Sequence, residues 1–155
     1  MSSFQIIVGS MLGGTEYVAE ACEEQLITLD HQVNLHLQPH FESILSDTLA
    51  QNTYKKNVWL ICTSTHGAGD FPDNIQNFVS DLNNCEQDLS AINFMIIAIG
   101  DSNYDTFCKA GIEINNSLKT KGCKELIEIN LLDMSKDIDP EMVAQEWIEQ
   151  KRDLL

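Results

Sequence analysis

The chain has 155 residues, of which 43% are hydrophobic, so we expect a single packed domain over residues 1–155. Its formal net charge is −15, from 24 acidic and 9 basic residues, which disfavours nucleic acids and anionic membranes as partners because both need cationic surfaces. No segment approaches the ~20 consecutive apolar residues of a membrane span, and the N-terminus lacks the pattern of a signal peptide.

Five cysteines occur without a Cys-x-x-Cys motif: Cys22, Cys62, Cys85, Cys108 and Cys123. Because the count is odd and the spacing fits neither a disulfide framework nor a zinc site, we expect free thiols in a reducing compartment and a cytoplasmic location.

Five short apolar segments, each typical of a β-strand, recur along the chain: residues 4–8, 33–37, 58–62, 94–99 and 126–129. The last is also compatible with a start one or two residues earlier. The first, third and fourth are nearly continuous and rich in β-branched residues, as in strands covered on both faces. The second and fifth alternate more, which is typical of positions nearer a sheet edge.

Helical patterns fill the intervals between these segments. They predict helices from near Thr15, over residues 41–50, after Pro72, up to Gly122, and from Asp139 onwards. Strands that alternate with helices predict an α/β fold, a three-layer doubly wound sheet of five parallel strands in the order 2-1-3-4-5. Such a sheet binds ligands beyond the carboxyl ends of its strands, so the loops after strands 1, 3 and 4 are the candidate functional segments.

The first of these loops, residues 9–15, runs from a strand directly into a helix. Its glycines let backbone N–H groups approach an anion, the helix N-terminus adds positive potential, and Ser10 and Thr15 add hydroxyls. No Lys or Arg occurs between Met1 and Tyr54, which argues against a P-loop NTPase. A phosphate held by neutral donors and a tight turn without a ligand both remain open here.

The second loop, residues 63–74, is long and holds two glycines, which is typical of a binding loop. His66 has no second His or Cys near it in sequence, so we expect no metal site and interpret the imidazole as packing, either on a planar ligand or on the protein. The polar residues around Pro72 are interpreted as helix-capping groups: Asp70, Asp73 and Asn74.

The third loop, residues 100–108, places Tyr104 among turn-forming residues at the end of a strand. A stacking platform for a ring system and an ordinary surface tyrosine are both compatible with this pattern.

Taken together, the three loops resemble those of the flavodoxin family, most closely the short MioC-type flavodoxins and the FMN domains of diflavin reductases. The matching segments are residues 9–19, 64–74 and 100–108, and the resemblance covers the whole chain. It implies a flavodoxin-like fold, with one noncovalently bound FMN as the cofactor and no metal.

The resemblance also implies which residues contact FMN. The phosphate would be held by the first loop: Ser10, Met11, Leu12, Gly13, Gly14 and Thr15. The inner face and edge of the ring would meet the second loop: Ser64, Thr65, His66, Gly67, Ala68 and Gly69. The outer face, against which Tyr104 would stack, and the pyrimidine end would meet the third loop: Gly100, Asp101, Asn103, Tyr104, Phe107 and Cys108. Asp133 matches an acid near the ribityl chain or the ring rim.

Three features depart from the family pattern. Leu12 replaces a hydroxyl residue of the usual Thr-x-Thr-Gly loop, and His66 replaces a common aromatic residue. The interval from Gly122 to Asp139 leaves no room for the insertion of long-chain members, so this is a short-chain form.

The function implied is electron transfer without independent catalysis, because the sequence shows no acid–base pair and no nucleophile–base arrangement. The expected partners are a flavodoxin/ferredoxin-type NADP reductase as donor and a basic-surfaced acceptor enzyme. A flavodoxin-like interaction module that has lost FMN, or binds it only weakly, remains an alternative because of Leu12 and His66.

Two other readings are disfavoured. A response-regulator receiver domain needs acidic residues after strand 1 and an Asp after strand 3, where this chain has Gly9, Ser10 and Ser64. An NAD(P)H-using FMN reductase needs basic residues near the first loops to recognise the nucleotide phosphate, and that segment has none.

Overall fold

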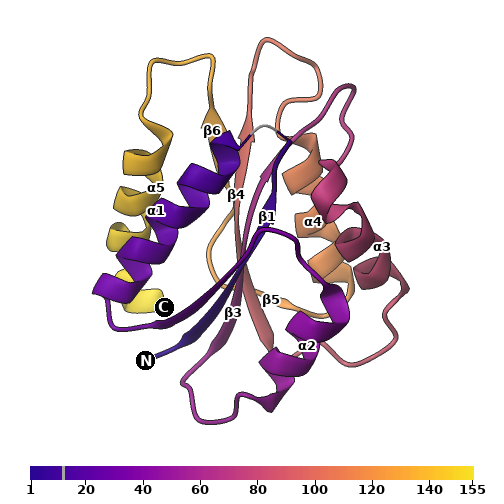
Figure 1. Cartoon of the computed structure of the whole chain (residues 1–155), viewed down its shortest axis with the longest axis vertical. Coiled ribbons are helices and arrows are strands. Elements are labelled where there is room, and N and C mark those ends of the chain that lie inside the picture. The colour runs from indigo at the N-terminus through magenta and orange to yellow at the C-terminus, as the bar shows by residue number, and fades with distance from the viewer. Residues whose placement is uncertain (12) are drawn as a thin grey trace.

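A parallel sheet lies between two layers of helices in the computed structural model, which describes residues 1–11 and 13–155 (Figure 1). The strands are β1 (Ser3–Gly9), β2 (Gln32–His36), β3 (Asn57–Ser64), β4 (Ile92–Gly100), β5 (Lys124–Glu125) and β6 (Asn130–Asp133). The helices are α1 (Gly14–Thr28), α2 (Phe41–Ala50), α3 (Gln76–Asn84), α4 (Lys109–Thr120) and α5 (Pro140–Gln150), and single 3₁₀ turns are η1 (Asp73–Ile75) and η2 (Arg152–Leu154).

The strand order is β2-β1-β3-β4-β5, which confirms the predicted topology. Every residue of β1 is buried, whereas exposed and half-buried residues alternate in part of β2. The continuous apolar segments therefore occupy central positions, and the alternating one lies at an edge. The helix predicted over residues 41–50 coincides with α2.

The predicted fifth strand over residues 126–129 is wrong in position. Two short strands, β5 and β6, instead pair with β4 on either side of that segment. Between the Phe94–Glu125 pair and the Ile97–Asn130 pair, the chain advances five residues while β4 advances three, so the extra residues leave the sheet. Ile127 is buried against the α1 and α5 side and Ile129 packs on the other side, which explains why the segment is apolar without being a strand.

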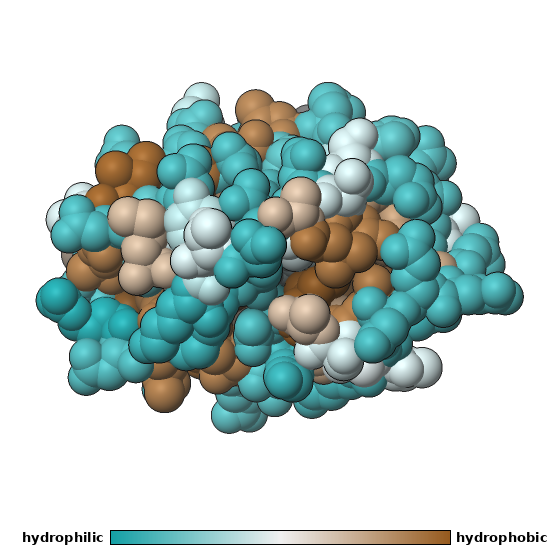
Figure 2. Space-filling view, turned by 90° about the horizontal axis from the view of Figure 1, so that it is seen from below, coloured by the Kyte–Doolittle hydropathy of each residue, from teal (hydrophilic) through white to brown (hydrophobic). Residues whose placement is uncertain are grey.

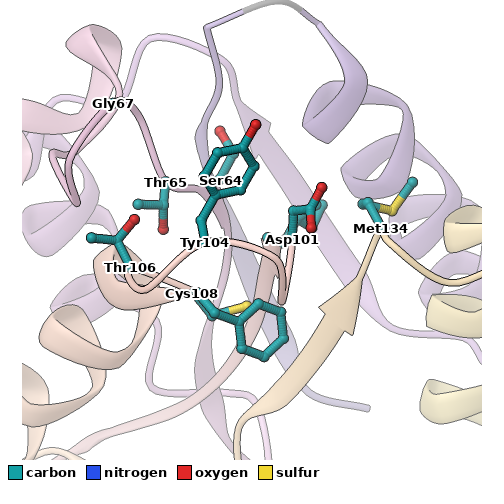
Figure 3. Close-up of a pocket in the computed structure, with 11 residues that line it drawn as sticks. Ser64, Thr65, Gly67, Asp101, Tyr104, Thr106, Cys108 and Met134 are labelled. Atoms are coloured by element: carbon teal, nitrogen blue, oxygen red, sulfur yellow. The ribbon is translucent and has the colours of Figure 1, made fainter.

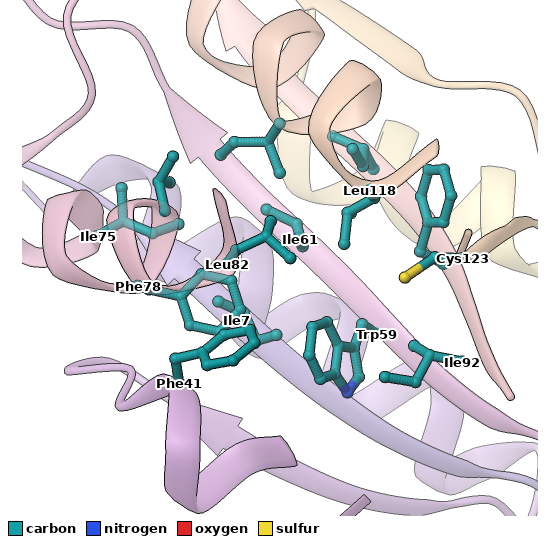
Figure 4. Close-up of a cluster of buried hydrophobic side chains, with 14 of the residues drawn as sticks. Ile7, Phe41, Trp59, Ile61, Ile75, Phe78, Leu82, Ile92, Leu118 and Cys123 are labelled. Atoms are coloured by element: carbon teal, nitrogen blue, oxygen red, sulfur yellow. The ribbon is translucent and has the colours of Figure 1, made fainter. Parts of the chain in front are cut away.

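Side chains from the two faces of the sheet form two hydrophobic clusters, as the alternation of a strand requires. One face is covered by α1 and α5, and the other by α2, α3 and α4 (Figure 1). On the second face, Phe41, Trp59 and Phe78 meet edge to face with ring centroids 5.4–6.0 Å apart (Figure 4). The buried Trp59 Nε1 donates a hydrogen bond to Thr48 Oγ1 at 2.8 Å, so its polar atom is satisfied.

Two of the predicted helix ends, at Asp139 and at Gly122, are confirmed. The Asp139 carboxylate accepts a hydrogen bond from Met142 N at 3.2 Å and caps α5, with Pro140 in the first turn. Gly122, at φ 89°, follows the end of α4. Within the described residues, no helix combines the length and hydrophobicity needed to cross a bilayer.

Candidate functional site

Two adjoining hollows open at the carboxyl ends of β1, β3, β4 and β6, where the loops after these strands meet. Their volumes are about 450 Å³ and about 420 Å³, within the range of small-molecule sites. We call them the first and the second hollow. They share four lining residues and so form one continuous cleft: Ser64, Thr65, Ile99 and Met134.

The first hollow lies between the loops after β3 and β4. In the view of Figure 3 the Tyr104 side chain lies between Thr65 on one side and Asp101 and Met134 on the other. Tyr104 is 68% exposed although it lines the hollow, so its ring is free to cover a ligand placed there. Apolar and small side chains complete the lining, including Ile99 and Phe107.

Cys108 also lines the first hollow, but its thiol is hydrogen-bonded to the protein backbone. Its Sγ–H donates to the carbonyl oxygen of Ala98 at 3.3 Å. Burial, together with the nearby Asp133 charge, raises the pKa of the Cys108 thiol to about 12. Cys108 therefore stays neutral near pH 7 and is not an activated nucleophile.

The second hollow reaches the N-terminus of α1. Gly13 is the N-cap residue, with φ 87°, a left-handed conformation that glycine adopts without strain. No side chain of the described residues caps this helix, so the amides of its first turn have no side-chain acceptor. Gly14 and the buried Thr15 line the hollow at this point. The start of α1 is positively polarised and could hold an anion such as a phosphate ester, although Glu141 also lines this hollow.

The loop after β3 is held in a tight turn. His66 N donates to Asp70 O at 2.8 Å, and Asp70 N donates to His66 O at 2.7 Å. Thr65 Oγ1 accepts a hydrogen bond from Ala110 N at 3.1 Å, which ties the loop to the first turn of α4. His66 is exposed and lines the second hollow, whereas Tyr104 lines the first, so the two rings do not border the same hollow.

Asp133 is the last residue of β6 and joins two loops of the cleft. Its Oδ1 accepts hydrogen bonds from Ser102 N and Ser135 N, both at 3.0 Å. The hydrogen bonds from Ser102 and then Ser135 hold the pKa of Asp133 well below its usual value. Met134 N donates to Gly100 O at 2.7 Å beside it, so the loop after β6 is fixed to the loop after β4.

The structure places most of the sequence-predicted residues around the cleft. The first hollow is lined by Ser64, Thr65, Gly67, Gly100, Asp101, Tyr104, Phe107 and Cys108. The second is lined by Ser10, Met11, Gly14, Thr15, Ser64, Thr65 and His66. Neither hollow is lined by Gly13, Ala68, Gly69, Asn103 or Asp133. Leu12 lies outside the described residues.

Sequence reasoning missed several residues of the cleft. Ile99 ends the fourth apolar segment and Met134 directly follows Asp133. Each is adjacent in sequence to a predicted site residue, and this adjacency is the one signal that could have indicated them. The α1 and α5 side of the second hollow adds Tyr17, Val18, Pro140 and Glu141.

The interpretation of Asp70, Asp73 and Asn74 as helix-capping groups is wrong. Neither η1 nor α3 has a side-chain cap, and the Asn74 amide instead contacts the loop after β1 and the end of β2.

The sequence and the fold are similar to those of known proteins. Residues 6–147 match the flavodoxin family. The chain is 39% identical over 145 residues to the MioC homolog of Pasteurella multocida, covering 94% of this chain and 92% of that protein. It is 40% identical over 151 residues to the MioC protein of Escherichia coli K12, covering 96% and 95%. A solved mutant of the flavodoxin from Pseudomonas aeruginosa superposes with a TM-score of 0.86 at 25% identity, over 99% of this chain and 98% of that one. The chain belongs to the flavodoxin family.

Proposed function

We propose that the chain binds one FMN noncovalently in the two-hollow cleft and carries single electrons from a flavodoxin/ferredoxin-type NADP reductase to a basic-surfaced acceptor enzyme. The observation that supports this most directly is the continuity of the cleft. An anion site at the start of α1 and a ring-sized hollow beside Tyr104 share Ser64, Thr65, Ile99 and Met134. A phosphate ester joined to a planar ring has the two ends that such a cleft accommodates.

At the phosphate end, the chain offers backbone amides and hydroxyls in place of cations. The uncapped first turn of α1 carries about half a positive charge, and Ser10 and Thr15 line the same hollow. The Ser10 hydroxyl accepts a hydrogen bond from Gly13 N at 3.1 Å, which ties the start of the loop to the N-cap of α1.

At the ring end, the apolar lining excludes water while Tyr104 covers one side. Phe107 and Ile99 form part of the lining, and the 68% exposed Tyr104 leaves the rim of the hollow accessible to a protein partner. When bound, the flavin supplies the redox chemistry, and the protein sets its orientation and potential.

The acidic residues around the first hollow influence the redox potential of a flavin bound there. Asp101 lines the hollow, and Asp133, at the end of β6, is held ionised by its hydrogen bonds. One like charge ~10 Å away costs about 1–2 kcal/mol at an effective dielectric of ~20, before screening by salt. These carboxylates therefore oppose added negative charge in the hollow and favour donation of an electron to an acceptor.

The test is a titration of cofactor-free protein with FMN, followed by stepwise reduction. We expect one FMN per chain by calorimetry, a bound flavin spectrum, and electron transfer from an NADP reductase of the stated class. Protein that shows no FMN binding by calorimetry at saturating FMN would support the cofactor-free interaction module instead. Protein that binds FMN but accepts no electrons from any such reductase would contradict the carrier role.

A further inference from the structure

The side chain of Asn74, in the loop after β3, bonds to the ends of two neighbouring strands, β1 and β2. Its Oδ1 accepts a hydrogen bond from Ser10 N at 2.9 Å, and its Nδ2 donates to Val8 O at 2.7 Å and to Leu37 O at 3.0 Å. The orientation of the amide follows from these partners, because one is a donor and two are carbonyl acceptors. A single half-buried side chain therefore joins the loop after β3 to the end of β1, the loop after β1 and the end of β2.

The residues on either side of Asn74 strengthen the same junction. Asp73 N donates to Met11 Sδ at 3.3 Å. Ile75 is fully buried, and a Cβ added to Gly9 would lie 3.1 Å from Ile75 Cγ2 and only 2.3 Å from Thr63 Oγ1. The turn η1 thus packs directly on the end of β1, and it keeps Asn74 in place.

From Asn74 the contacts continue into the anion site. Ser10, whose amide is held by Asn74, accepts the Gly13 amide on its hydroxyl, and Gly13 is the N-cap of α1. Asn74 itself lines neither hollow and so would not touch FMN. Its influence on a ligand must pass through Ser10 and the loop that Ser10 begins.

We infer that Asn74 is a positioning residue of the flavin site, which sets the conformation of the phosphate loop and so determines the preference for FMN over riboflavin. This inference rests on the proposed function. Loss of Asn74 releases Ser10 N and two carbonyl groups, so the loop no longer presents its amides in one arrangement. Riboflavin lacks the phosphate, so its binding does not depend on the anion site at the start of α1.

The experiment compares wild type with Asn74→Ala, and uses Asn77→Ala as a matched control because Asn77 is exposed in α3. Dissociation constants for FMN and for riboflavin are measured on cofactor-free protein. We expect Asn74→Ala to weaken FMN binding by about 10- to 100-fold and riboflavin binding by no more than about threefold. The control should change neither affinity. Asn74→Ser, which can retain one hydrogen bond, replaces the alanine variant if that variant does not fold.

Amide hydrogen exchange gives a readout that needs no flavin. We expect the amides of Ser10 and Gly13 to exchange faster in Asn74→Ala than in wild type, while amides of β4 remain protected. A folded Asn74→Ala protein with an unchanged ratio of FMN to riboflavin affinity would overturn the inference while leaving the proposed function intact. Wild-type protein that binds no FMN would instead overturn the proposed function, and the inference with it.

Discussion

Tyr104 combines high exposure with a fixed backbone. Tyr104 N donates to Asp101 O at 3.1 Å, and Phe107 N donates to Tyr104 O at 3.2 Å, so successive turns present the ring at the rim of the first hollow. We predict that Tyr104→Leu weakens FMN binding by roughly tenfold, since stacking on an aromatic side chain is worth about 1–3 kcal/mol. Fluorescence titration measures this loss. Tyr54→Leu, in the loop before β3 at the opposite end of the sheet, serves as the control and should bind FMN as wild type does.

Asp133 makes the stability of the folded protein depend on pH in the acid range. Because its hydrogen bonds from Ser102 and Ser135 lower the pKa of the folded-state carboxyl, its contribution to stability is fully present above the usual pKa of 3.8. That contribution is lost as the pH falls below this value towards the folded-state pKa. We predict that Asp133→Asn lowers the free energy of unfolding at pH 7 and that the difference from wild type shrinks below about pH 4. Urea denaturation at several pH values measures this, and a difference that stays constant with pH would contradict it. The exposed Asp137→Asn is the control.

Residues of the site could be predicted from the sequence where the residue type itself indicates the chemistry. Glycines, hydroxyls and Tyr104 in three loops led to the cleft, because parallel strands bring those loops to one edge. Asn74 was misassigned because asparagine caps helices and also bridges distant backbone segments, and only the fold brings Ser10, Val8 and Leu37 within its reach. Met134 was missed for the same reason, since a lone methionine has no local pattern.

At the scale of elements, the helices and the central strands were predictable from periodicity, and the last strand was not. The segment 126–129 is apolar because both faces of the sheet edge receive its side chains, Ile127 on one and Ile129 on the other. Alternating burial of this kind imitates a strand. The residues registered against β4 lie before and after the segment, although Leu126 N still donates a hydrogen bond to Phe94 O of β4 at 2.8 Å. The position of the last strand therefore depends on its hydrogen-bond register with β4, which is set by tertiary structure and not by the local sequence.

The packing of α4 on β4 depends on Gly111. A Cβ added there would lie 2.4 Å from Ala98 Cβ, so the helix can approach the strand only with glycine at this position. We predict that Gly111→Ala lowers the free energy of unfolding by about 1–3 kcal/mol, because both residues are buried and overpacking outweighs the better helix propensity of alanine. Asn116→Ala, exposed on the same helix, should stabilise the protein by about 0.5 kcal/mol. Chemical denaturation of both variants measures the contrast, and stabilisation by Gly111→Ala would contradict the packing argument.

Across the whole molecule, charge is distributed unevenly between the two ends of the sheet. Of the nine basic residues, seven lie at the amino ends of the strands: Lys55, Lys56, Lys119, Lys121, Lys124, Lys151 and Arg152. Lys109 and Lys136 lie at the cleft end, together with many of the acidic residues, including Asp101, Asp105 and Asp133. Figure 2 looks onto the end opposite the cleft, where hydrophilic surface surrounds apolar patches. The cleft end is thus the negative end of the molecule, and we expect this charge distribution to orient a basic partner of the kind proposed above during approach.

This asymmetry leads to a test of association kinetics. We predict that Asp105→Lys, next to Tyr104, slows association with an NADP reductase by roughly 2- to 5-fold at low ionic strength. Glu86→Lys makes the same change of charge after α3, at the opposite end, and should leave the rate nearly unchanged. Stopped-flow measurements should show the difference disappearing near 1 M salt, where the Debye length is about 3 Å. Equal effects of the two substitutions would show that the orientation of the charge distribution does not matter.

The interrupted edge beside β4 also bears on self-association. A second molecule that adds a strand to a sheet needs an unbroken row of free N–H and C=O groups. Here β5 contributes two residues, β6 contributes four, and the segment between them turns away. This border of the sheet therefore offers no continuous template for intermolecular strand addition.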